Sequence, residues 1–153
     1  MKKTIFIISL LLGGIVFENA TAQIPVTIRT NISAQPVWGP VGYNYVEYYY
    51  IPGIDAFYSV PTRQYIYQQN GSWMFTPALP ARLSNYNLYS GYKVVVNDPE
   101  PYRNAATYRV KYAAYKGRHD QKIIRNSSDS KYFVNKDHPQ HNKAKKDNHH
   151  HNR

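Results

Sequence analysis

The fold is decided by residues 45–75, which read YVEYYYIPGIDAFYSVPTRQYIYQQNGSWMF. Aromatic and β-branched residues, which favour strands, fill this stretch, and turn residues divide it into short runs. The expected strands are residues 45–51, 56–60, 64–68 and 72–75. Because the turns between them are short, neighbouring strands should pair antiparallel. The stretch therefore predicts a meander of three or four strands.

Asn70-Gly71 is the strongest turn signal in the chain. Both residues tolerate the positive φ that a type I′ turn requires. In the strand before this turn, strict alternation places Tyr65 and Tyr67 on one face and Ile66 on the other. The pattern predicts a hairpin closed at Asn70-Gly71.

A further strand and a helix are expected after the meander. Residues 92–96, YKVVV, form the strand, and the unbroken valine run indicates burial on both faces. A helix over residues 99–116 is favoured because Asp98 can cap it and Pro99 suits its first turn. Apolar and basic side chains also alternate over residues 108–112, as they do in a strand, so a strand over these residues remains an alternative.

We therefore expect a mainly β or small α+β domain over residues 23–134, best ordered at about 36–116. It would contain an antiparallel meander of three to five strands, with one helix as an option. Residues 24–28 favour an edge strand or an extended arm, and Ile123-Ile124 and residues 132–134 suggest a peripheral strand. Residues 135–153 hold no large apolar side chain, which predicts a disordered, basic, His-rich tail.

The N-terminus has the pattern of a secretory signal peptide. Lys2 and Lys3 precede an apolar run over residues 4–17, and Ala20-Thr21-Ala22 matches a cleavage site. The run is too short for a transmembrane helix, which needs roughly 20 apolar residues. We expect removal of residues 1–22, no membrane span afterwards, and a location in the periplasm, on the outer membrane or outside the cell.

The charge suggests the kind of partner. The chain has a net charge of +10, which removal of Lys2, Lys3 and Glu18 lowers to +9. In an exported protein this excess favours an anionic envelope polymer or another envelope protein as partner over nucleic acid. The alternative is that the charge serves solubility alone.

Catalytic signatures are sparse. The absence of cysteine excludes disulfides and thiol catalysis, and no nucleophile elbow, zinc-protease motif or phosphate loop is present. We predict no cofactor. Glu47 and Asp55 offer a carboxylate pair only if the fold brings them together. The leading interpretation is a non-catalytic envelope-binding or structural module, with an enzyme using an unrecognised carboxylate pair as an alternative.

The 16 tyrosines are the chain's most distinctive feature. Rings facing outward from a sheet would suit stacking on sugars or docking on another protein. The candidate binding residues are Tyr48, Tyr50, Tyr65 and Tyr67, together with the basic Arg109 and Lys111. The alternative is that the rings replace aliphatic side chains in a small core.

The tail offers a second candidate chemistry, because it concentrates imidazole groups. Imidazole nitrogen binds divalent transition metals, but a flexible set of ligands has no preformed geometry. Weak metal binding through the tail is therefore a further alternative. The candidate ligands are His138, His141, His149, His150 and His151.

The quoted stretch also resembles a family of small, uncharacterised, tyrosine-rich exported proteins from Gram-negative bacteria. The likeness lies in residues 46–52, 54–60 and 64–67 and in Gly71-Ser72-Trp73, with residues 36–40 and 108–112 as further parts of the pattern. It spans about residues 36–134. The resemblance implies export and no assigned activity, so it supplies no catalytic residue.

Overall fold

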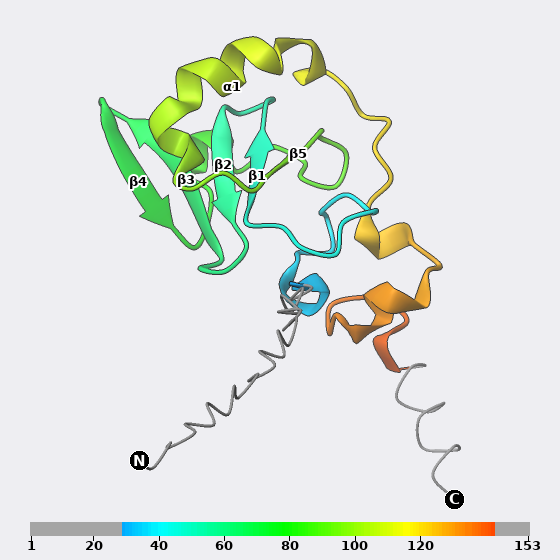
Figure 1. Cartoon of the computed structure of the whole chain (residues 1–153). Helices are drawn as coiled ribbons and strands as arrows, with labels where there is room; N and C mark the ends of the chain where they lie inside the picture. Colours follow the sequence, from blue (N-terminus) through cyan, green and yellow to red (C-terminus); the bar gives the residue numbers. More distant parts are fainter. Residues whose placement is uncertain (1–28, 143–153) are drawn as a thin grey trace, which may run out of the picture.

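The computed structural model describes residues 29–142, which are built around one five-stranded antiparallel sheet (Figure 1). Its strands are β1 (Tyr48–Ile51), β2 (Ala56–Ser59), β3 (Gln64–Gln69), β4 (Ser72–Thr76) and β5 (Val94–Val96). Strands β1 to β4 form a meander, and β5 pairs with the other side of β1, so the order is β4-β3-β2-β1-β5. The predicted mainly β or small α+β class is confirmed.

The β3–β4 hairpin has the predicted turn. Asn70 and Gly71 have φ values of 51° and 78°, as a type I′ turn requires, and Gln69 pairs with Ser72 across it. Strand β1 begins later than expected, at Tyr48. The side chain of Asn31 bonds both the N–H and the C=O of Val46, at 3.0 and 2.7 Å, so these groups are not available to a neighbouring strand.

The predicted helix is confirmed in its central part. Helix α1 (Ala105–Lys111) lies between the 3-10 helices η3 (Pro101–Asn104) and η4 (Ala113–Tyr115), and the alternative strand is wrong. Asp98 does not cap the helix as expected, because its carboxylate accepts a hydrogen bond from the Tyr108 hydroxyl. Helix α1 covers one face of the sheet, where the Tyr108 ring lies 5.8 Å from that of Tyr50 and 5.4 Å from that of Phe57 (Figure 1).

The other face of the sheet is covered by irregular segments. Trp38, which comes before β1, is buried with its ring 5.5 Å from Tyr49 and 5.0 Å from Tyr58. Tyr86, from the connection between β4 and β5, packs against the same cluster. The sheet is therefore the middle of three layers, and side chains on both of its faces are buried.

The segment after residue 120 packs against the segment before β1. Ile123 bridges Pro40, and Ile124 and Tyr132 are buried beside Val37. The expected peripheral strand is wrong, because this region has one isolated bridge and two 3-10 helices. These are η5 (Ile124–Asn126) and η6 (Ser130–Val134); the remaining 3-10 helices are η1 (Ile32–Ala34) and η2 (Ala81–Leu83).

The ordered fold continues beyond the expected boundary at residue 135. Asn135 and His138 are buried, and the amide of Asn135 donates to the carbonyl of Gln35. The expectation of disorder is therefore wrong for residues 135–142. The expected signal peptide, the arm at 24–28 and His149, His150 and His151 lie outside the described residues. Within residues 29–142, no helix has the length and apolar character to cross a membrane.

Candidate functional site

The predicted platform of outward tyrosines is not formed. Tyr50, Tyr65 and Tyr67 are 1%, 8% and 4% exposed, and Tyr48 is half-buried. Alternation would leave an outward face only if one side of the sheet met solvent, and here both sides are covered. The core interpretation is therefore correct for Tyr50, Tyr65 and Tyr67, and their choice as exposed binding residues is wrong.

Burial also opposes ionisation of these hydroxyls. It raises the pKa of Tyr65 to about 12, and it raises the pKa of Tyr50 further, with help from the neighbouring Asp55 carboxylate. Both side chains stay protonated at neutral pH. Both act as packing groups, and the Tyr50 hydroxyl also donates a hydrogen bond to Asp55.

The segment that contains helix α1 is rich in basic residues. Residues 101–119 contain five Lys and Arg residues and no Asp or Glu. Three of the five have an acidic partner outside the segment: Arg103 pairs with Glu100, Arg109 with Asp55, and Arg118 with Asp120. Within the described residues, Lys111 and Lys116 have no ion-pair partner. The segment thus presents two uncompensated cations.

Arg109, a predicted binding residue, is engaged within the fold. Its Nε and Nη2 atoms donate to Asp55 Oδ2 at 2.9 and 2.6 Å, and the Tyr50 hydroxyl donates to Asp55 Oδ1 at 3.0 Å. The Asp55 carboxylate raises the pKa of Arg109. The arrangement attaches α1 to the β1–β2 turn. Of the two predicted basic residues, only Lys111 is without an ion-pair partner among residues 29–142.

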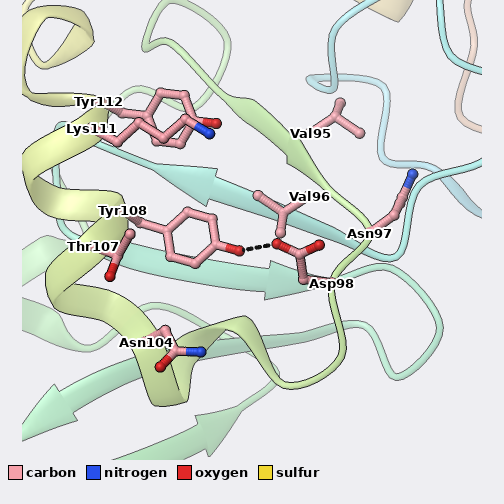
Figure 2. Close-up of a pocket in the computed structure, with 9 residues that line it drawn as sticks. All are labelled: Val95, Val96, Asn97, Asp98, Asn104, Thr107, Tyr108, Lys111 and Tyr112. Carbon is pink, nitrogen blue, oxygen red and sulfur yellow. Dashed lines mark hydrogen bonds between the residues drawn. The ribbon is translucent and has the colours of Figure 1, made fainter.

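Two open hollows lie along α1, and Tyr112 lines both of them. The larger, of about 330 Å³, lies between β5 and α1 and has Lys111 and Tyr112 at one end and Asn104 at the other (Figure 2). The smaller, of about 180 Å³, is lined by Tyr112, Lys116 and the Arg109–Asp55 pair. Lys111 Nζ lies 5.3 Å from the centre of the Tyr112 ring. We call Lys111, Tyr112 and Lys116 the Tyr112 strip.

The larger hollow is lined by a negative charge at Asp98 and a positive charge at Lys111. Tyr108 reaches from α1 to Asp98, with 2.5 Å between the hydroxyl and Oδ2 (Figure 2). Burial and this hydrogen bond raise the pKa of Tyr108, so the phenol stays protonated beside the carboxylate. An anion would therefore be repelled near Asp98 and attracted toward Lys111.

Sequence reasoning missed Lys116 and Tyr112 as members of this surface. Tyr112 lies one helical turn from Tyr108 and shares its face of α1, but which part of that face stays accessible depends on how α1 crosses the sheet. Lys116 lies within residues 101–119, the segment that contains no Asp or Glu. That lack of acidic residues was the signal that could have identified it.

The possible acid pair does not form. Glu47 precedes β1 and lies opposite Val60, while Asp55 precedes β2 at the other end of the same hairpin. Asp55 and Val60 are separated by five residues, about 16 Å of extended chain. Paired carboxylates of glycosidases lie roughly 5 to 10 Å apart. Glu47 and Asp55 do not match that arrangement.

The metal candidates are only partly described. His138 Nδ1 accepts from the N–H of Gln140 at 3.1 Å, which leaves Nε2 protonated in the neutral ring and without a lone pair for a metal. His141 Nδ1 lies 2.7 Å from the carbonyl of Phe133, which leaves its Nε2 as a ligand atom. Within residues 29–142 no three His, Asp or Glu side chains gather as a metal site. Metal binding through His149, His150 and His151 stays a prediction.

No protein-family model, curated protein or solved structure matches this chain. The resemblance to tyrosine-rich exported proteins therefore stays a prediction.

Proposed function

We propose that this chain is an exported, non-catalytic module that binds an anionic polymer of the cell envelope through the Tyr112 strip. The observation that carries the proposal is the acid-free segment of residues 101–119. Lys111 and Lys116, which form no ion pair within the described residues, each line an open hollow together with the half-buried Tyr112 ring. Such a surface can bind a ligand whose negative charges are attracted by the lysines and whose uncharged parts pack against the aromatic ring.

The shape of the surface favours a polymer over a small substrate. The two hollows are open and share Tyr112 in their lining, so an extended chain can lie across both of them. Arg109 keeps α1 in place through Asp55, which presents the strip as a preformed surface. The lysines then interact with successive anionic groups along the polymer.

Catalysis is the weaker alternative. The carboxylates of Glu47 and Asp55 lie at opposite ends of the β1–β2 hairpin, and the buried tyrosines have raised pKa values that oppose formation of a nucleophilic phenolate. A binding role needs neither group. It uses the exposed charge that the fold leaves uncompensated.

Export is tested separately from binding. We expect cleavage between Ala22 and Gln23 when the full chain is produced in a bacterial host. Mass spectrometry of the periplasmic and secreted fractions should identify a chain that begins at Gln23. An intact Met1 in those fractions would overturn this part of the proposal.

The binding surface is tested by a pull-down on purified peptidoglycan, lipopolysaccharide and capsular polysaccharide. The mature wild-type protein is compared with the Lys111→Gln/Lys116→Gln double variant. We expect the double variant to be retained less on at least one anionic polymer, because two surface charges are lost without any change in the core. A Tyr112→Ser variant should also be retained less.

The matched control removes the same charge elsewhere. Arg63 and Lys136 are exposed and form no ion pair within the described residues, so Arg63→Gln/Lys136→Gln lowers the net charge equally. Equal loss of retention in both double variants would show that net charge acts without a site. No retention of the wild-type protein on any polymer would contradict the function itself.

A further inference from the structure

A second surface, formed by the loop before β5 and the segment after Gly117, has the features of a ligand site. Two hollows of about 610 and 340 Å³ share Ile123 and Asn126 and so are adjoining. Tyr89 and Arg125 line the smaller, and His119 and Lys122 line the larger. Ligand sites commonly have volumes of roughly 300 to 1,000 Å³. We call these four side chains with Asn87 and Asn126 the Tyr89 groove.

The loop that carries Tyr89 is held by a buried lysine. Lys93 is 1% exposed, and its Nζ donates to the carbonyl of Leu88 at 2.9 Å and to that of Gly91 at 2.7 Å. It has no acidic partner within the described residues, and burial lowers its pKa to about 8. Burying an ammonium group without a counter-ion is costly. The buried Lys93 ammonium group holds residues 88–91 in place. In this loop Tyr89 is 42% exposed.

Backbone hydrogen bonds hold the segment that carries Arg125 against residues 37–39. The N–H of Arg125 donates to the carbonyl of Val37, and that of Ile124 donates to the carbonyl of Gly39, both at 2.8 Å. The Arg125 guanidinium lies 5.0 Å from the centre of the Tyr89 ring. The cation and the exposed ring are therefore held together by two separately anchored segments.

The charge of the groove favours an anion. Arg125 and Lys122 form no ion pair within the described residues, and Asp120 is the one carboxylate among the side chains that line the two hollows. Arg118 binds both oxygens of Asp120, which offsets its charge. A guanidinium binds a carboxylate with two parallel hydrogen bonds. The Tyr89 ring supplies the apolar face that a sugar requires. The polar groups are the side-chain amides of Asn87 and Asn126 and the hydroxyls of Ser127 and Ser128.

We infer that the Tyr89 groove binds a sugar that carries a carboxylate, with Tyr89 against the ring of the sugar and Arg125 on the carboxylate. This site is separate from the Tyr112 strip and does not depend on it. Lys93 acts as a positioning residue, since it holds the loop and lies beneath the surface.

The test is calorimetric titration of the mature protein with a trimer of galacturonic acid and with the neutral galactose trimer. We expect the wild-type protein to bind the acidic trimer at least about tenfold more tightly than the neutral trimer. A difference of about tenfold in affinity corresponds to the contribution of one charged hydrogen-bonded pair. Arg125→Gln and Tyr89→Leu should each weaken binding of the acidic trimer, and Tyr89→Phe should preserve it because the ring remains.

Two control variants test whether binding is specific to the groove. Arg63→Gln and Lys136→Gln each remove an exposed positive charge outside the groove and should leave the affinity unchanged. Melting temperatures of the groove variants check that the fold is intact. The inference is overturned if the wild type does not bind the acidic trimer or binds the neutral trimer equally well. It is also overturned if folded Arg125→Gln and Tyr89→Leu bind normally, or if Arg63→Gln or Lys136→Gln weakens binding as much as Arg125→Gln does.

Discussion

The hydroxyl of Tyr86 occupies the space in which a side chain at Gly91 would lie. A Cβ atom built at Gly91 would be 1.9 Å from Tyr86 Oη, and one at Gly53 would be 2.5 Å from the same atom. The Tyr86 ring is thus packed between two glycines from different parts of the chain. This contact joins the loop after β4 to the β1–β2 turn.

Gly91→Ala should therefore destabilise the protein by about 1 to 3 kcal/mol, the usual cost of overpacking. Chemical denaturation measures the change in the free energy of unfolding. Gly117→Ala is the matched control, because no atom lies within 4 Å of a Cβ atom there and its effect should be small. Equal effects at the two positions would contradict the Tyr86 packing.

Gly71→Val should destabilise the β3–β4 hairpin by roughly 1 to 3 kcal/mol, because a β-branched residue is strained at positive φ. No neighbouring atom lies within 4 Å of a Cβ atom at Gly71, so the cost comes from the backbone alone. Asn70→Gly, which keeps the same turn available, is the control. An unchanged melting temperature in Gly71→Val would argue against a type I′ turn.

Asn135→Ala should lower stability by about 1 to 3 kcal/mol, because it leaves the buried carbonyl of Gln35 without its hydrogen bond. Truncation after Val134 should lower the melting temperature further, since it also removes His138, whose ring lies 5.0 Å from that of Phe133. Thermal unfolding followed by circular dichroism measures both. Unchanged melting after truncation would show that residues 135–142 contribute nothing to the fold.

Alkaline pH should unfold the protein. Tyrosine has a pKa of about 10 in an unfolded chain, whereas burial raises the pKa of Tyr65 to about 12 and those of Tyr49 and Tyr50 further. The folded state then holds more protons than the unfolded state above pH 10, so stability falls as pH rises through that range. Absorbance of tyrosinate should increase together with loss of the circular dichroism signal. Titration of all tyrosines near pH 10 in the folded protein would contradict their burial.

Most of the local structure could be predicted because its causes are local. The Asn70-Gly71 turn, the alternation around Ile66 and the helix near Tyr108 each depend on residues close together in the chain. Which tyrosines stay accessible could not be predicted, since Tyr65 and Tyr67 are buried by Trp38 and Tyr86 on one face of the sheet and Tyr50 by helix α1 on the other. Alternation separates two faces without indicating whether solvent meets either one.

The candidate sites depend even more on distant contacts. Asp55 compensates Arg109 across 54 residues, and this pairing decides which cations of α1 stay unpaired. Lys93 holds the loop that exposes Tyr89 through backbone carbonyls, which leave no mark in a sequence pattern. The charge of these surfaces could be counted from the sequence, but its distribution required the fold.

Binding without turnover is tested most directly by titrating the mature protein with the envelope polymer that retains it, at several salt concentrations. The same samples are then analysed chromatographically for polymer length. We predict that affinity falls steadily as salt rises, since charge attraction is screened over about 8 Å at physiological ionic strength, and that the polymer keeps its length. Affinity that is independent of salt, or shortening of the polymer by the pure protein, would contradict the account.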